Sequence, residues 1–258
     1  MRRSLRRKLN RLAENVFGID GSPGIVIADI GTLVVGDMHI GMEEKLGRQG
    51  IHFGSASERL GTDVMGLCSE FGLKRIVFLG DVKDSIGYPD RIEYDELGSF
   101  FGGIHGMDIR IAKGNHDGNI EKVLKVIGVE AEIGLEILIG RYAFMHGHTE
   151  PSVEAMQRRC LFAGHGHFGI RNGDLTEKAF IVAKIDKRSI GKAYERYDRN
   201  ERIVMVPAFS PLITGTEVSR SLERHMPALR GIFNLRDSTI ITTDGRRIKT
   251  ARYLDAQG

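Results

Sequence analysis

Short apolar runs that each end in a cluster of Asp, Asn and His constrain the fold of this chain most. Five such clusters occur, at residues 37–39, 80–81, 114–117, 146–148 and 164–167. They hold six of the nine histidines, so these side chains are not scattered at random. In open α/β sheets, ligand sites gather at the carboxyl ends of the strands. The pattern therefore predicts strands whose ends bring distant polar clusters together.

The first half of the chain alternates between apolar runs and longer segments. The runs are β-branched and bounded by Gly or Asp, which is typical of buried strands. They cover residues 24–28, 32–35, 75–79 and 108–112. The segments between them have helical length and end near glycines that suit helix C-caps. The predicted helices cover residues 56–71, 91–101 and 119–127, before Gly72, Gly102 and Gly128.

The second half is rich in strand-like runs with short connections. These runs cover residues 135–139, 141–145, 160–163, 180–185 and 202–206. Gly140 and Asn172-Gly173 suit hairpin turns, and residues 238–245 read as one more hairpin. Alternation followed by a strand-rich half predicts an α/β (α+β-like) chain with two packed mixed sheets flanked by helices. We expect one domain over residues 21–258.

Composition places the chain among ordinary globular proteins. It has 258 residues, of which 41% are hydrophobic and 28% charged. No apolar run approaches the ~20 residues that cross a bilayer, and the basic start has no apolar stretch behind it. Cys68 and Cys160 lie outside any paired spacing. We therefore expect buried thiols in a reducing cytoplasm.

Residues 1–20 are predicted to form a basic helical arm. Arginines and lysine crowd this end, and Leu5, Leu9, Leu12 and Val16 recur at helical spacing. Such a helix is suited to nucleic acid, an acidic partner or a membrane surface. The plainer alternative is a solvated helix whose cations face water.

The clusters contain the donor types that hold divalent cations. If the chain is extended there, Asp37 and His39 leave the same face, as do His165 and His167. The two oxygens of the Asp81 carboxylate can bridge two ions, and Gly80 before it allows a sharp turn and a metal close to the backbone. Taken singly, the Asp and Asn residues could merely cap turns, which is their usual role after strands.

The ordered series Asp-X-His, Gly-Asp, Gly-Asn-His-Asp, His and Gly-His-X-His over residues 36–167 resembles the calcineurin-like metallophosphoesterase superfamily. Within it the chain is similar to the small phosphoesterases related to the SbcD nuclease, of archaeal or DNA-ligase-associated type. Residues 206–212, which follow a predicted strand, favour that subgroup. The resemblance implies a four-layer sandwich and a dinuclear hydrolase.

The resemblance also implies residue roles. One metal would be held by Asp37, His39 and His167, and the second by Asn115, His146 and His165, with Asp81 bridging them. His116 would act on the substrate as general acid or transition-state stabiliser, oriented by Asp117. Two divalent cations, usually Mn²⁺ with Fe²⁺ or Zn²⁺ as alternatives, would activate a hydroxide that attacks phosphorus.

Other polar residues are weaker candidates for the site. His148 and Asp84 are candidate pocket residues, since His148 could replace His146 and Asp84 could equally cap a turn. His52, His105 and His225 lie outside every cluster. Arg158, Arg159, Arg171 and Lys187 could contact phosphates, although surface charge is the commoner role.

The leading functional hypothesis is a phosphodiesterase acting on a phosphate ester of nucleotide or nucleic-acid type. A phosphomonoesterase of small metabolites would use the same centre, because specificity lies in the surrounding loops. A non-catalytic binding scaffold is the third hypothesis. No Walker-type loop for ATP-driven work is present, and the sequence makes no prediction of oligomeric state.

Overall fold

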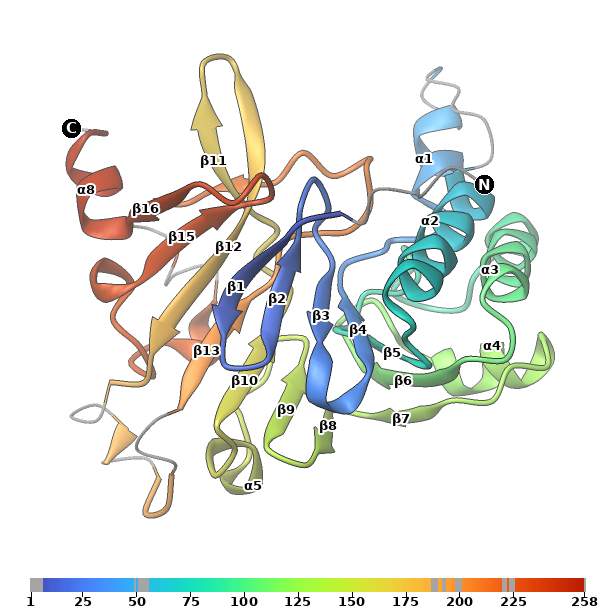
Figure 1. Ribbon diagram of the computed structural model, residues 1–258. Helices are drawn as coiled ribbons and strands as arrows, with labels where there is room; N and C mark the ends of the chain where they lie inside the picture. Colours follow the sequence, from blue (N-terminus) through green and yellow to red (C-terminus); the bar gives the residue numbers. More distant parts are fainter. Residues whose placement is uncertain are drawn as a thin grey trace, which may run out of the picture.

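In the computed structural model the chain forms two β-sheets packed face to face, with helices outside them (Figure 1). The structure describes residues 7–48, 50, 56–186, 190–191, 194–197, 201–219, 222 and 226–257. The predicted class, two mixed sheets flanked by helices, is confirmed. No helix in these residues is both long and apolar enough to cross a bilayer.

The first sheet changes from antiparallel to parallel pairing along its strand order, β1 to β7. Its strands are β1 (Leu9–Ala13), β2 (Val16–Ile19), β3 (Ile25–Ile27), β4 (Thr32–Val35), β5 (Arg75–Phe78), β6 (Asp108–Ala112) and β7 (Glu132–Gly134). The helices α1 (Met42–Arg48), α2 (Ala56–Phe71), α3 (Arg91–Gly103) and α4 (Ile120–Val126) connect the parallel strands. They lie together at the right of Figure 1.

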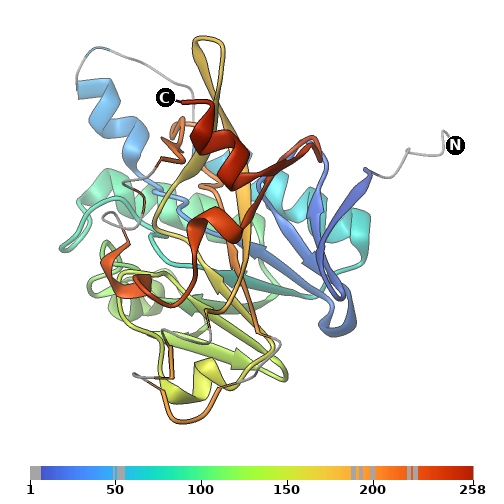
Figure 2. The ribbon, with the colours of Figure 1, turned by 90° about the vertical axis from the view of Figure 1, so that its left-hand side faces the viewer.

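The second sheet has the strand order β14-β11-β12-β13-β10-β9-β8, with β15 and β16 attached to β12. Its strands are β8 (Glu136–Ile139), β9 (Tyr142–Met145), β10 (Cys160–Ala163), β11 (Phe168–Asn172), β12 (Leu175–Lys184), β13 (Arg202–Met205), β14 (Thr216–Glu217), β15 (Thr239–Thr242) and β16 (Arg247–Lys249). The short helices α5 (Val153–Met156) and α8 (Thr250–Asp255) accompany it, and α8 with the β15–β16 hairpin lies nearest the viewer in Figure 2.

The core is layered because strand residues alternate between two faces. In the first sheet Val35 and Phe78 pack under the helices, whereas Val34 and Val77 face the second sheet. Phe144 of the second sheet also faces this inner layer. The packing of the two sheets against each other therefore holds the carboxyl ends of their parallel strands at one end of the molecule.

The amino-terminal arm is not helical in its described residues, so that prediction was wrong over residues 9–19. β1 and β2 pair as an antiparallel hairpin, with Leu9 opposite Ile19. Asn15 has a left-handed backbone (φ 59°), which ends any helix and makes the turn. Leu12 and Val16 are buried between the sheets. The spacing of these residues fitted a helix, but pairing between strands determines the conformation of such a short segment.

Most other predicted elements lie close to their expected bounds. α2 and the strands β4, β6 and β10 have the predicted limits. α3 runs two residues further, so Gly102 lies inside it rather than after it. Gly72 and Gly128 have left-handed backbones just after α2 and α4, as C-caps require.

Candidate metal centre

The polar clusters follow parallel strands of both sheets. In the first sheet Asp37 follows β4, Asp81 follows β5 and Asn115 follows β6. In the second sheet His146 follows β9 and His165 follows β10. The loops meet across the sheets, because the backbone amide of His165 donates to both carboxylate oxygens of Asp37 at 3.1 Å. The strand ends therefore share one site.

Left-handed backbone conformations are concentrated in this site. The non-glycine residues that adopt them here, with φ between 45° and 66°, are Asp37, His39, Asp81, His165 and His167. The extended geometry predicted for both two-apart pairs is therefore wrong. Hydrogen bonds between loops hold the unusual backbone, since the amide of His39 donates to the carbonyl of Asp81 at 2.9 Å. Strain of about 1–3 kcal/mol per residue is typical of functional sites.

Two glycines allow the loops to touch. A Cβ on Gly80 would lie 2.6 Å from the backbone nitrogen of Gly114 and 2.7 Å from Nδ1 of His146. A Cβ on Gly114 would lie 2.1 Å from Oδ1 of Asp81. Gly80 is thus needed for contact between loops, whereas the sequence suggested that it admits a metal to the backbone.

One group of donors joins the two sheets. Donor atoms of Asp37, His39 and His167 all lie within 4.8 Å of one another. Nε2 of His167 is 3.2 Å from Oδ1 of Asp37. The rings of His39 and His167 meet edge to face with centroids 5.4 Å apart. This triad combines one carboxylate and two imidazoles, a mixed set that suits Mn²⁺, Fe²⁺ or Zn²⁺.

A second group lies beside the first, and its carboxylate, Asp81, also lies close to a histidine of the first group. It consists of Asp81, His146 and His165. Nε2 of His146 is 3.2 Å from Oδ2 of Asp81, 3.0 Å from Nδ1 of His165 and 3.2 Å from Oδ1 of Asn115. The same Oδ2 of Asp81 is 3.6 Å from Nε2 of His39 in the first group. Asp81 therefore lies between the two sets.

The outer nitrogens of two imidazoles have fixed partners. Nδ1 of His39 is 3.2 Å from Oδ1 of Asp84, and Nδ1 of His146 is 2.7 Å from the carbonyl oxygen of Leu79. Such contacts orient the rings of metal-binding histidines. Nε2 of His39 is buried and has no hydrogen-bond partner within the described residues. A buried ring nitrogen is costly to leave unpaired, so this orphan fits a cation at the centre of the site.

The electrostatics of the cluster favour added positive charge. Burial alone would raise the pKa of Asp81, but the hydrogen bond and charge of His146 hold it below its usual range. Burial alone would lower the pKa of His146, but the Asp81 hydrogen bond and the Asp37 charge raise it to about 9. Burial and then the charge of His146 lower the pKa of His165 to about 4. The carboxylates thus favour a proton on the imidazole of His146, and a bound cation would compete with that proton.

His116 lies at the edge of the cluster. Its backbone amide donates to Oδ1 of Asp81 at 2.9 Å, and its ring meets that of His39 with centroids 4.9 Å apart. Nδ1 contacts the carbonyl oxygen of Asp84. A carbonyl accepts only, so Nδ1 carries a proton and Nε2 is the atom left for a ligand.

Asp117 supports the loops and does not orient the ring of His116. Its Oδ1 accepts from the amide of Val82 at 2.9 Å and of Lys83 at 3.4 Å, and its Oδ2 accepts from Gly114 at 2.8 Å. The carboxylate is fully buried. The orienting role that the resemblance implied belongs to the carbonyl of Asp84, while Asp117 ties the loops after β5 and β6 together.

Three further side chains support the loops of the site and were missed by the sequence analysis; Lys83 and Glu93 are buried, and Lys178 is half-buried. Nζ of Lys83 donates to the carbonyl oxygens of His116 at 2.6 Å and Gly87 at 2.7 Å. Glu93 of α3 accepts from the amide of Asp84 at 2.9 Å. Lys178 of β12 donates to the carbonyl of Ala208 at 2.8 Å. The position of Lys83 among acidic neighbours was the available signal.

Residues 206–212, which follow β13, also lie against the site. The backbone amide of Phe209 donates to the carbonyl of Gly36 at 2.8 Å, and that of Ser210 donates to the carbonyl of Asp37 at 3.4 Å. The segment that favoured the SbcD-related subgroup in the sequence is therefore a neighbour of the first donor group.

The remaining predicted residues divide between the site and other surfaces. His148 is half-buried, with its ring centroid 5.3 Å from that of His146, so it lines the site. Asp84 holds His39, as described above. His105 is exposed, and His52, His225 and Lys187 lie outside the described residues. Arg158 and Arg159 precede β10, at the end opposite the cluster, and Arg171 is exposed on β11.

Comparison with solved structures identifies the fold. The Pseudomonas putida nuclease MPE superposes with a TM-score of 0.62 at 15% identity, covering 92% of this chain and 98% of that protein. The Escherichia coli phosphoesterase Yfce gives a TM-score of 0.39 at 15% identity, covering 85% of this chain and 98% of that one. No protein-family model matches the chain, and no curated protein matches it.

These findings define a class at the level of fold. The likeness to the nuclease spans nearly all of both chains, so the sandwich expected for the metallophosphoesterases is present. At 15% identity the likeness establishes architecture alone. The chemistry must therefore be argued from the Asp and His cluster itself.

Proposed function

We propose that the protein is a metal-dependent phosphoric ester hydrolase with a dinuclear centre. The observation that carries this proposal is the position of Asp81, whose Oδ2 lies within 3.6 Å of Nε2 of His39 and 3.2 Å of Nε2 of His146. One carboxylate between two imidazole-containing groups is what two neighbouring cations need.

The ligand assignment follows the two donor groups without His116, whose ring forms a third, overlapping group with His39 and Asp81. Asp37, His39 and His167 would hold one ion, Asn115, His146 and His165 the other, and Asp81 both. The orphaned Nε2 of His39 supports this assignment. Mn²⁺ suits the donor set, with Fe²⁺ or Zn²⁺ as alternatives. When bound, the ions supply Lewis acidity toward a phosphoryl oxygen and a water molecule.

His116 is the residue we assign to proton transfer. The carbonyl of Asp84 fixes its Nδ1 as a donor, which leaves Nε2 to meet the substrate. A protonated Nε2 would donate to the departing oxygen or stabilise the equatorial phosphoryl oxygens. Lys83 and Asp117 are positioning residues, because they hold the backbone on either side of His116.

We infer a phosphodiester of nucleotide or nucleic-acid type as the substrate. The loop after Lys83 exposes Ile86 (67%) and Tyr88 (57%). It packs closely behind His116, since a Cβ on Gly118 would lie 2.4 Å from the carbonyl oxygen of Ile86. Exposed aromatic and apolar side chains near a phosphate site suit stacking with bases. The solved structure with the higher similarity is named a nuclease, which supports the same inference and the nuclease-related subgroup.

A cytoplasmic location fits the cysteines. Cys68 and Cys160 are both buried free thiols. Burial raises the pKa of Cys68 to about 12, so this thiol stays protonated and unreactive. We propose that the protein works in a reducing compartment, where such thiols are stable.

The experiment compares substrates at one centre. Purified protein loaded with Mn²⁺ is given a bis-aryl phosphodiester, the aryl monoester and a single-stranded oligonucleotide, with chelator-treated protein as control. We expect diester and oligonucleotide cleavage well above monoester cleavage. Faster monoester turnover would favour the phosphomonoesterase, and no turnover with Mn²⁺, Fe²⁺ or Zn²⁺ would favour the binding scaffold.

A further inference from the structure

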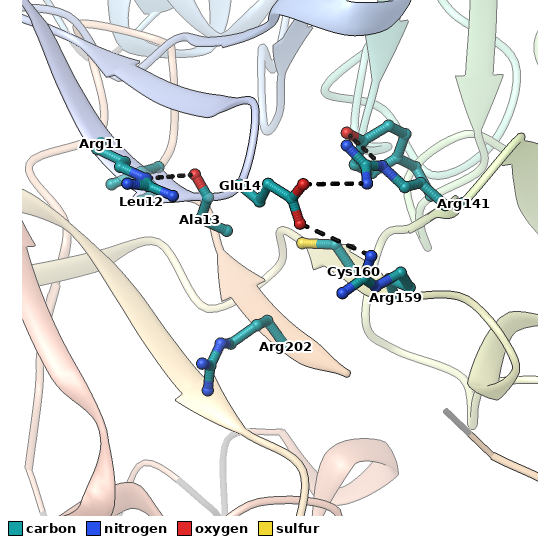
Figure 3. Close-up of a pocket in the computed structure, with 9 residues that line it drawn as sticks. Arg11, Leu12, Ala13, Glu14, Arg141, Arg159, Cys160 and Arg202 are labelled. Atoms are coloured by element: carbon teal, nitrogen blue, oxygen red, sulfur yellow. Dashed lines mark hydrogen bonds and ion pairs between the residues drawn. The ribbon is translucent and has the colours of Figure 1, made fainter. Parts of the chain in front are cut away.

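A polar cavity lies at the end of the sandwich opposite the metal centre. It has a volume of about 510 Å³ and is lined by the β1–β2 turn and the starts of β9, β10 and β13 (Figure 3). The cluster residues follow the carboxyl ends of β9 and β10, whereas this cavity includes Tyr142 and Cys160, their first residues. Strand direction therefore separates the two sites.

The strand register explains why basic residues gather there. Cys160 is in register with Tyr142 on one side and with Arg202 on the other. Val204, two residues after Arg202, belongs to the layer between the sheets, so Arg202 points to the open end of that layer. Lys184 lies opposite Arg202 on β12 and adds a further cation to this edge.

The cavity has more cationic groups than carboxylates. Four arginines line it, Arg11, Arg141, Arg159 and Arg202, with Glu14 the one carboxylate in the lining. Figure 3 marks ion pairs from Glu14 to Arg141 and Arg159. Their N–O distances are 3.6 and 3.7 Å, which are too long for hydrogen bonds. Arg141 also pairs with Asp29 at 3.0 Å, just outside the lining.

Two of the guanidinium groups have donors to spare. Within the part of the chain that the structure describes, the guanidinium of Arg11 donates only to the carbonyl of Ala13, from Nε at 3.4 Å. Arg202 has no carboxylate within salt-bridge distance among the described residues. A guanidinium presents several donors in a plane that matches the oxygens of a phosphate group. The unmet donors therefore favour an anion with several oxygens.

We propose that this cavity binds a phosphorylated small molecule of mononucleotide size. The four arginines would hold the phosphate, and buried Leu12, Tyr142 and Cys160 form an apolar floor for an organic part. The volume lies in the range of about 300–1,000 Å³ typical of small-molecule sites. Because the lining comes from both sheets, the ligand would link them and stabilise the fold.

Thermal unfolding and calorimetry with adenosine monophosphate test the proposal. Chelator-treated full-length protein is used, so that cations at the metal centre do not hold the nucleotide. We expect the wild type to unfold at a higher temperature with nucleotide. The double variant Arg159→Gln/Arg202→Gln should bind at least about ten-fold more weakly, since two charge-assisted contacts are lost. The matched control Arg252→Gln, which changes an exposed residue of α8, should bind like the wild type.

The outcomes separate this site from the metal centre. Mn²⁺-loaded turnover should be the same in the double variant and the wild type, because neither arginine lies near the donor groups. Nucleotide binding that survives in the double variant would overturn the proposal, as would no binding to the wild type. Equal binding of inorganic phosphate would refute the mononucleotide size, and binding of a single-stranded oligonucleotide alone would refute a small-molecule site.

Discussion

Gly114→Ala tests whether contact between the loops positions the bridging carboxylate. The added Cβ would lie 2.1 Å from Oδ1 of Asp81 and 2.4 Å from its backbone nitrogen. Ordinary contact begins near 3.4 Å, so Asp81 must move by about 1.3 Å. Metal–ligand distances are fixed to within about 0.2 Å. We therefore expect that Asp81 no longer bridges the two ions and that turnover falls at least about 100-fold.

The assay separates this geometric effect from unfolding. Overpacking should lower the free energy of unfolding by about 1–3 kcal/mol, measured with urea in the presence of chelator. Metal content is then measured on protein that remains folded. The matched control is Gly98→Ala in α3, where a Cβ meets nothing within 4 Å, and it should raise stability by about 0.5–1 kcal/mol. A Gly114→Ala variant with two bound ions and full turnover would refute the reasoning.

Other predictions concern the supporting residues. His116→Ala should lower kcat by about 10²- to 10⁴-fold and keep both ions; loss of the ions would contradict its role in proton transfer. Asp117→Asn should lower the free energy of unfolding by about 1–3 kcal/mol, because one backbone amide then faces an amide donor; an unchanged urea midpoint would refute the anchoring. Burial and then Glu43 raise the pKa of Glu96 to about 7 from 4.5. Its ionisation therefore opposes folding, and stability from this group falls as pH rises from 4.5 to about 7. The gain in stability of Glu96→Gln over wild type should grow across that window, and an equal gain at both ends would contradict it.

The meeting of the clusters could be predicted from the sequence because it depends on strand direction. Apolar runs before Asp37, Asp81 and Asn115 predicted strands whose ends gather polar clusters. The structure pairs these strands in parallel, so that they end at one edge of the sheet. The backbone of the site could not be predicted in the same way. The left-handed conformations of His39 and His165 depend on hydrogen bonds from other loops, which leave no local pattern.

Contacts between segments also account for the errors. The family resemblance implied that the carboxylate of Asp117 orients the ring of His116, its neighbour in the chain. That carboxylate instead turns back to the amides of Val82 and Gly114, which lie on two different loops. The spacing of Leu12 and Val16 fits a helix. In the structure, however, β2 pairs with β3 and β1 pairs with β2, so both strands extend the first sheet at its edge. In each case the deciding partner lies far along the chain or in another strand.

Metal stoichiometry tests the central claim most directly. Elemental analysis and calorimetric titration with Mn²⁺ would be performed on chelator-treated wild type and on Asp81→Asn. The matched control is Asp63→Asn, a substitution of an exposed residue of α2. We predict that the wild type and the control bind two ions per chain. In Asp81→Asn, neither site should retain its affinity for Mn²⁺. A single ion in the wild type, or two ions bound unchanged after Asp81→Asn, would contradict a centre built around that carboxylate.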